Sequence, residues 1–185
     1  IDSATLRENV VSLARNIGYT PYSKRSAQAN ISFFVDTTDY TDVPQTITLN
    51  KGLVASSNAF ANESYTFAIL DDITVPVSDN TASFNNIAIY EGIYLTSTFT
   101  VNSFDPDQRF ILENSGIDLS TLRVVVKPSQ SSTVTRKYIQ SDSLFDVTSE
   151  SPVYFVHEVD GERYELIFGD GIFGKKLDAP SFIEV

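Results

Sequence analysis

Residues 151–176 read SPVYFVHEVDGERYELIFGDGIFGKK, and this stretch decides the fold. Two apolar runs, rich in β-branched and aromatic residues, flank Asp160-Gly161. An Asp-Gly pair between such runs is the strongest short-range signal for a β-hairpin. It suits a type I′ turn, in which both central residues take φ > 0. The stretch therefore predicts two antiparallel strands joined by a two-residue loop.

A loop of Asp160 and Gly161 alone fixes the register of this hairpin. His157 would lie opposite Tyr164, and Glu158 would lie opposite Arg163. Because side chains alternate between the two faces of a strand, a slip of one residue would break both the aromatic face and the ion pair. Tyr154 would pair with Ile167, and the aromatic face would hold Val153, Phe155, His157, Tyr164, Leu166 and Phe168.

A helix is predicted at residues 3–17. Thr5 and Glu8 have the spacing of a capping box, and Gly18 and Pro21 are suited to ending the helix. Apolar residues between them recur at helical spacing and form one stripe. This helix packs on its own domain or docks on another subunit. The residues of the stripe that we take as a candidate subunit interface are Leu6, Val10, Leu13 and Ile17.

From Ala27 onward the apolar residues alternate with polar ones, apart from Phe34, which interrupts the alternation. This period of two predicts a strand with one buried face. The rest of the chain shows no second helix and many short apolar runs divided by turn signals. The further strands are predicted at residues 45–49, 53–56, 65–70, 73–77, 84–90, 93–101, 109–113, 121–127, 135–140, 152–159, 162–168 and 181–185.

Short strands with frequent breaks are typical of sandwiches and barrels. We therefore predict a mainly β fold with antiparallel sandwich or barrel-like sheets, in one body or two lobes, and one N-terminal α-helix. Residues 1–26 would form the helix and a linker arm, and residues 27–185 the β domain. The best internal boundary is Asp105-Pro106-Asp107, which places a possible lobe boundary near residues 104–108.

The charge of the chain limits its partners. The 185 residues include 24 Asp and Glu and 13 Lys and Arg, giving a net charge of −11. This charge repels phosphate backbones and anionic lipid surfaces, so nucleic-acid and membrane binding are not expected. Cysteine is absent from the sequence, which excludes disulfides and thiolate metal sites. The chain begins at Ile1 and contains no Met, so we expect a fragment of a longer protein.

A glycine motif closes the hairpin. Gly169, Gly171 and Gly174 spell G-x-G-x-x-G and precede two lysines, which imitates a phosphate-binding loop. A dinucleotide fingerprint must open a helix, but Pro180 follows shortly after the motif. We therefore expect turns at these glycines. The predicted structural-turn residues of the whole stretch are Asp160, Gly161, Gly169, Asp170, Gly171 and Gly174.

Other candidate chemistry is weak. His157 is the only histidine, and on a strand it is expected to be a packing residue. Asp36, Asp39 and Asp42 lack the glycine and spacing of a calcium loop. Two acidic pairs, Asp71-Asp72 and Asp105/Asp107, resemble glycosidase carboxylates only in composition. No catalytic, cofactor-binding or metal-binding residues are predicted, and no small-molecule substrate. The tyrosines weighed as a carbohydrate platform are Tyr40, Tyr65, Tyr90 and Tyr94.

Several short segments together carry a family resemblance. They are Leu6 through Ala29, Thr46-Ile-Thr-Leu-Asn-Lys-Gly52, Tyr65-Thr-Phe with Asp71-Asp72-Ile73-Thr74-Val75, Asn114 through Val126, and the closing hairpin with Phe168-Gly-Asp-Gly-Ile-Phe-Gly174. In this order they resemble the baseplate wedge subunit of T-even-type contractile-tail bacteriophages, within the wider baseplate J-like family.

This resemblance implies a structural, non-enzymatic subunit of the virion. It would be copied around a sixfold tail baseplate after assembly in the bacterial host cytoplasm. Its partners would be other baseplate wedge proteins and a second copy of itself, and it would rearrange on sheath contraction. Two alternatives stay open on sequence alone. They are a carbohydrate-binding β module of a tail fibre or secreted enzyme, and a hydrolase that uses paired aspartates.

Overall fold

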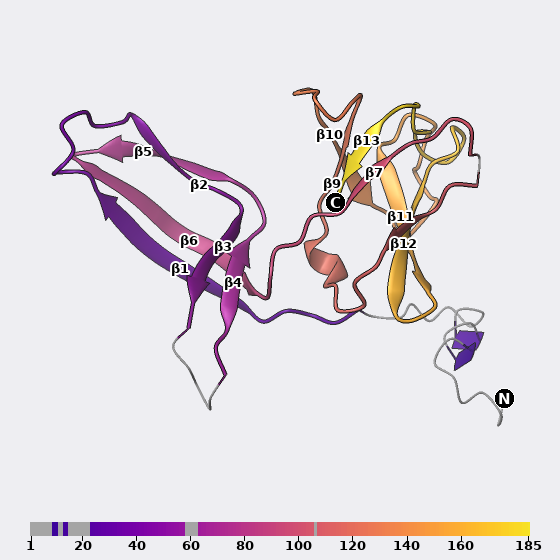
Figure 1. The fold of residues 1–185 in the computed structure, drawn as a ribbon, viewed down its shortest axis with the longest axis horizontal. Helices are drawn as coiled ribbons and strands as arrows, with labels where there is room; N and C mark the ends of the chain where they lie inside the picture. Colours follow the sequence, from indigo (N-terminus) through magenta and orange to yellow (C-terminus); the bar gives the residue numbers. More distant parts are fainter. Residues whose placement is uncertain (1–8, 11–12, 15–22, 58–62, 106) are drawn as a thin grey trace. The chain divides into compact units, whose positions relative to one another are not determined.

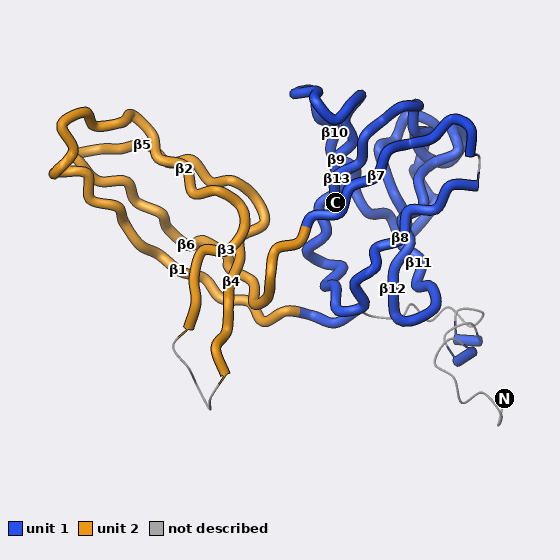
Figure 2. The backbone as a smooth tube through the Cα atoms, in the orientation of Figure 1, with its two compact units in different colours: residues 1–25, 96–185 blue, residues 26–95 orange. Residues whose placement is uncertain are grey.

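The computed structural model describes residues 9–10, 13–14, 23–57, 63–105 and 107–185. These residues are mainly β, and nearly all neighbouring strands are antiparallel, so the predicted fold class is confirmed (Figure 1). The chain divides into two compact units, which Figure 2 colours separately. Unit 1 comprises residues 1–25 and 96–185, and unit 2 comprises residues 26–95.

Unit 2 is an open sheet built around one long strand. Its strands are β1 (Gln28–Asp36), β2 (Thr46–Leu49), β3 (Gly52–Ser56), β4 (Thr66–Ile69), β5 (Ile73–Ser78) and β6 (Thr81–Glu91). The order is β2-β5-β6-β4-β3, and β1 also pairs with β6. Strands β5 and β4 meet opposite ends of β6 along one edge, because Ala82 and Tyr90 each have a β1 partner on the other edge.

The hairpin between β5 and β6 has a two-residue turn. Ser78 pairs with Thr81, which leaves Asp79 and Asn80 as the loop, with φ of 50° and 57°. Two successive residues with positive φ define a type I′ turn, whose twist matches that of the flanking strands. The sequence signal Ser78-Asp79-Asn80 therefore forms a tight turn without glycine.

The core of unit 2 collects the alternating apolar residues of these strands. Phe84 and Ile89 of β6 are buried, and β1 packs Ile31, Phe33 and Val35 against them. The rings of Phe33 and Phe84 stack at 4.9 Å between centroids. The period of two in the sequence thus places one face of β1 in the core and leaves the other face exposed.

Unit 1 holds the C-terminal hairpin. Its elements are β7 (Thr98–Thr100), β8 (Phe110–Leu112), the 3₁₀ helix η1 (Leu119–Thr121), β9 (Val124–Lys127), β10 (Arg136–Gln140), β11 (Val153–Val159), β12 (Arg163–Phe168) and β13 (Phe182–Glu184). The sheet order is β7-β13-β9-β10-β11-β12-β8. Only β10 and β11 run parallel among these described pairs, and β13 lies inside the sheet between β7 and β9.

The two ends of this sheet approach each other. The Gln108 side chain donates from Nε2 to the carbonyl of Thr100 at 2.8 Å and accepts from the amide of Asn102 at 2.8 Å. Phe99 of β7 meets Phe110 of β8 edge to face at 5.6 Å. These contacts join the terminal strands, so the sheet is nearly closed and barrel-like.

The partly buried Phe168 packs against three aromatic residues of the unit 1 core. Its ring contacts Phe110 at 5.5 Å, Tyr138 at 5.6 Å and Tyr154 at 6.4 Å between centroids. Aromatic pairs in such edge-on and tilted arrangements stabilise a core beyond the area they bury. Burial raises the pKa of Tyr154 to about 12, so this phenol stays neutral at physiological pH.

The division between the units falls at residues 25/26 and 95/96. Residues 104–108, where the sequence placed a possible lobe boundary, lie within unit 1 between β7 and β8. Of the predicted N-terminal helix, Asn9, Val10, Leu13 and Ala14 are helical, and the capping-box residues lie outside the described part of the chain. None of the described helical segments is long and apolar enough to span a membrane.

Candidate functional site

The register of the β11–β12 hairpin differs from the prediction by one residue. Val159 pairs with Arg163, so the loop has three residues, Asp160, Gly161 and Glu162. Gly161 and Glu162 both take positive φ, at 78° and 57°. A three-residue loop is the next most common hairpin connection after the two-residue turn. The predicted type I′ turn and two-residue loop at Asp160-Gly161 are therefore wrong.

This shift changes which side chains share a face. His157 lies opposite Glu165, and Tyr154 lies opposite Phe168. Tyr154, not Val153 or Phe155, therefore shares the buried face with Tyr164, Leu166 and Phe168. The physical reason is burial: the observed register places the large Tyr154 ring in the core and leaves His157 exposed.

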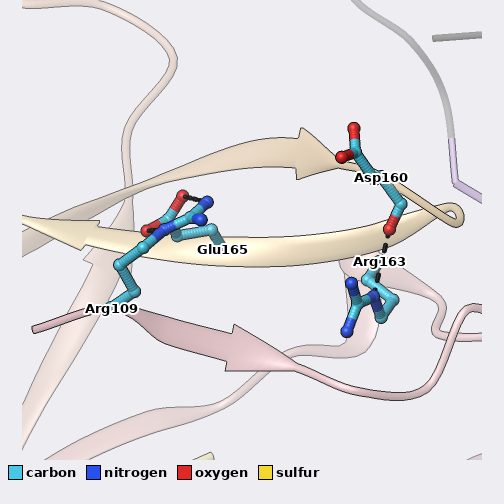
Figure 3. Close-up of polar contacts among 4 residues, drawn as sticks. All are labelled: Arg109, Asp160, Arg163 and Glu165. Atoms are coloured by element: carbon cyan, nitrogen blue, oxygen red, sulfur yellow. Dashed lines mark hydrogen bonds and ion pairs between the residues drawn. The ribbon is translucent and has the colours of Figure 1, made fainter.

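An ion pair on the other face of β12 joins it to the start of β8. Arg109 donates from Nε and Nη2 to the two carboxylate oxygens of Glu165, each at 2.7 Å (Figure 3). Such two-point contacts between guanidinium and carboxylate fix geometry as well as charge. The bonds from Arg109, together with its charge, lower the pKa of Glu165, and the smaller charge effect of His157 acts in the same direction.

Arg163 makes a second link to the region after β8. It donates from Nη1 to the Glu113 carboxylate at 2.7 Å and from Nε to the carbonyl of Asp160 at 3.0 Å. Figure 3 shows the contact with Asp160, which braces the hairpin loop. The predicted pairing of Glu158 with Arg163 across the hairpin is wrong, because Glu158 lies opposite Tyr164 and Arg163 lies opposite Val159.

The glycine motif after β12 forms a compact loop that folds onto itself. The amide of Gly171 donates to the carbonyl of Gly174 at 3.0 Å, and the amide of Gly174 donates to Thr148 at 3.1 Å. A Cβ atom at Gly169 would collide with the backbone of Gly174. Gly174 itself has φ of 94° and packs against Val153. The motif therefore serves the close approach of two backbone segments.

The loop also fills its own anion-binding position. The Asp170 carboxylate accepts hydrogen bonds from the amides of Ile172 and Phe173, both at 2.8 Å. These two bonds lower the pKa of Asp170, so the carboxylate remains ionised. In a phosphate loop, backbone amides of this kind point at the ligand. Here these amides donate to the side chain of Asp170 instead of to a ligand.

The remaining candidate carboxylates and the histidine are scattered. The described residues contain no group of three or more His, Cys, Asp or Glu side chains that could hold a metal ion. Asp72 accepts the amide of Lys51 at 2.7 Å, and Asp105 accepts the amide of Asp107 at 3.2 Å. Asp36 accepts both the amide and the hydroxyl of Thr38. Asp36 and Asp105 thus shape their own turns, whereas Asp72 joins the residue before β5 to the turn between β2 and β3.

The tyrosines weighed as a carbohydrate platform occupy different elements of unit 2. Tyr40 is exposed in the β1–β2 connection, and Tyr65 precedes β4. Tyr90 lies within β6 and is half-buried. The Nζ atom of Lys51 lies over the Tyr94 ring, 5.6 Å from its centre.

The predicted interface helix is described in part. Val10 and Leu13 are 49% and 46% exposed, so about half of each apolar side chain faces solvent. Leu6 and Ile17 lie outside the described residues. The two described members leave apolar surface available for a partner.

Sequence reasoning missed two features. The Arg109–Glu165 pair depends on the pairing of β8 with β12, and no local pattern reports that pairing. The second feature is the outer edge of β1, for which a signal existed: Phe34 interrupts the alternation and is 68% exposed. A large apolar residue on the polar face of a strand indicates a surface with a partner.

Comparison with known proteins finds a distant similarity to a phage tail protein. No family model matches it. It is similar to baseplate wedge protein gp6 of Enterobacteria phage T4, with 25% identity over 171 residues. The match covers 91% of this chain and 24% of the phage protein, so the chain spans about a quarter of the length of that relative. This distant similarity supports a baseplate-related family and does not single out the baseplate J-like family.

Proposed function

We propose that this chain is part of a structural subunit of a contractile phage tail baseplate. One observation carries the proposal: the similarity to a baseplate wedge protein extends over 171 residues, more than either unit contains, so it includes parts of both units. The subunit would hold neighbouring wedge proteins and a second copy of itself in the virion, after assembly in the host cytoplasm. It acts through contacts and not as an enzyme.

The mechanical role follows from rigid sheets joined to partner surfaces. The nearly closed sheet of unit 1 is braced by a continuous aromatic core and by ion pairs between strands. Such a body moves as a whole when its neighbours move. We infer that sheath contraction changes the contacts around the units and leaves the sheets intact. The apolar stripe with Val10 and Leu13 is the candidate subunit interface.

A charge placed on the stripe tests this role. Leu13→Glu should reduce co-assembly with the other wedge proteins of the same phage, because a carboxylate would have to be desolvated in the interface. The half-exposed position predicts an unfolding free energy lowered by less than about 1 kcal/mol. The measurements are co-purification of the wedge proteins and urea unfolding.

Gln130→Glu is the matched control. It adds the same charge at an exposed position between β9 and β10. It should leave both assembly and unfolding unchanged. Equal losses of folding and assembly in Leu13→Glu would overturn the assignment of the stripe. Binding of the unaltered chain to a glycan array, without co-assembly, would favour the carbohydrate-binding alternative.

A further inference from the structure

The outer edge of β1 carries a row of backbone groups directed away from its own sheet. Ala27 accepts the amide of Glu91 at 2.8 Å, and the amide of Thr37 donates to Asn80 at 2.8 Å, so odd-numbered residues bond to β6. In an antiparallel pair, the alternate residues direct their N–H and C=O groups to the other side. Those residues are Gln28, Asn30, Ser32, Phe34 and Asp36.

No strand within the described residues pairs with this side of β1. Figure 1 shows β1 as an outer strand of unit 2. At nine residues it is the longest edge strand described, since β7 and β8 have three residues each, β2 has four and β3 has five. The central residues of β1 include neither proline nor lysine, which usually protect an exposed edge.

The irregularity of this pair leaves the outer edge of β1 intact. The register shifts between Ile31 and Phe33, and the extra residue lies on β6 at Asn86, which has φ of 55°. The Ser32 hydroxyl accepts the Asn86 amide at 2.9 Å, and the Asn30 side chain donates to the Asn86 side chain at 2.9 Å. The bulge is thus fastened from β1 by side chains, and the backbone groups on its outer edge stay available.

Charge indicates which occupant fits this edge. Residues 26–95 contain eight Asp and Glu and a single lysine, Lys51, so eight negative charges and one positive charge give unit 2 a net charge of −7. Asp36 is the last residue of β1, and Asp39 and Asp42 follow it in the connection to β2. A second unit 2 would bring a like charge of the same size, which disfavours self-pairing. A basic segment would be attracted.

We propose that the outer edge of β1 accepts, as an added strand, an extended segment of a partner protein with Lys or Arg beside the Asp36–Asp42 end. Strand addition draws its affinity from main-chain hydrogen bonds, and pockets for alternate side chains give it selectivity. Phe34, exposed at the same edge, calls for an apolar residue in the incoming segment. This inference rests on the assembly function proposed above and names its surface and the chemistry of its partner.

Amide exchange provides a direct readout. The full chain is mixed with the other wedge proteins of the same phage, and hydrogen–deuterium exchange is followed at single residues. Co-assembly should slow exchange at Asn30, Ser32 and Phe34, because their amides gain acceptors. The amides of Ile31, Phe33 and Val35 already donate to β6 and should change little. Such alternation distinguishes an added strand from general burial.

A proline at the edge tests the same contact by removal. Phe34→Pro deletes an outward amide that β6 does not use, and edge strands tolerate proline there. Binding of the wedge proteins should weaken about tenfold or more. Phe34→Thr is the control, since it keeps the amide and loses only the ring, so it should weaken binding less. If circular dichroism shows that Phe34→Pro does not fold, Phe34→Lys is used instead. Lysine on an edge strand opposes the addition of another strand, so this variant should also weaken binding.

The charge of the partner is tested separately. Asp39→Asn with Asp42→Asn should weaken binding and reduce its dependence on salt, because the attraction between exposed charges is screened at high ionic strength. Asp142→Asn with Asp178→Asn removes the same charge from exposed positions of unit 1 and should have no effect on binding.

The outcomes separate the two proposals. Absence of co-assembly by the unaltered chain would overturn the baseplate function itself. Co-assembly with unchanged exchange on β1 and an inert Phe34→Pro would overturn the edge site alone. A dimer of the chain in sedimentation, abolished by Phe34→Pro, would show that a second copy occupies the edge and would overturn the basic partner.

Discussion

Units 1 and 2 use similar strands and reach opposite solutions at the ends of their sheets. In unit 1 the three-residue strands β7 and β8 come together through Gln108 and two phenylalanine rings. In unit 2 the nine-residue strand β1 ends the sheet with its outer backbone groups unpaired by any described strand. Closure removes the edges at which another chain can add, whereas an open edge keeps that possibility.

This difference indicates that the closed sheet of unit 1 contributes mainly to stability and the open edge of unit 2 mainly to recognition. In unit 1 the glycine motif bonds its backbone groups to its own loop and to Thr148. Unit 2 is strongly acidic, and the outer edge of β1 has no partner among the described strands. Substitutions in the closed sheet of unit 1 and its loops should therefore act mainly on folding, and substitutions on the β1 edge mainly on binding.

Gly169→Val should have the largest effect. A Cβ at this position would overlap the backbone of Gly174, and backbone cannot move aside as a flexible side chain can. The unfolding free energy should fall by roughly 4 kcal/mol or more, which is exceptional for one substitution. The measurement is urea unfolding followed by near-ultraviolet circular dichroism of the unit 1 tyrosines.

Gly116→Ala is the companion control for that experiment. Its added Cβ would approach only Asn114 Oδ1, at 3.2 Å, and this side-chain atom can shift slightly while it still accepts the amide of residue 116. Stability close to that of the unaltered chain is expected. A Gly169 variant as stable as Gly116→Ala would show that the loop of unit 1 is not closely packed.

Paired core truncations should come next in size. Phe168→Ala removes the ring shared by Phe110, Tyr138 and Tyr154, and Phe84→Ala removes the buried ring that stacks on Phe33. Each should cost about 3–5 kcal/mol. Because each unit has its own core, amide exchange should accelerate mainly in the unit that carries the substitution. Equal acceleration in both units would show that the two cores unfold together.

The Arg109–Glu165 pair should give the smallest effect, and its sign depends on pH. The pKa of Glu165 is lowered from 4.5 in the folded chain, so the pair contributes stability above that ordinary value. The contribution is lost as pH falls through the lowered pKa. Glu165→Gln should therefore be slightly less stable than the unaltered chain at pH 7 and equal to it in strong acid. A difference that persists in acid would assign the effect to packing instead of charge.

Local patterns were sufficient for the strands and not for their partners. Alternation and turn signals located every strand that the structure describes, since period two reports one buried face. The register of β11–β12 was missed by one residue, because an Asp-Gly pair does not state whether Glu162 joins the loop. The parallel pairing of β10 with β11 is also non-local and leaves no period in the sequence.

In the candidate site, too, the sequence predicted local features but not contacts that depend on the folded chain. The glycine motif was correctly expected to lack a following helix in the described residues, but the role of Asp170 as internal anion needs the folded loop. The exposure of Phe34 was visible as a break in the alternation. The net charge of unit 2 could not be calculated from the sequence alone. The limits of the unit, at residues 26 and 95, follow from tertiary contacts and not from composition.

The position of β13 has a consequence for force. Phe182–Glu184 is bonded to β7 on one side and to β9 on the other, and Val185 and Ser97 exchange amide and carbonyl bonds at 2.9 Å. A strand at an edge can be peeled away one bond at a time. A strand bonded on both flanks, pulled along its own axis, loads all of these bonds at once in shear. A force applied along β13 would therefore be shared by β7 and β9 together.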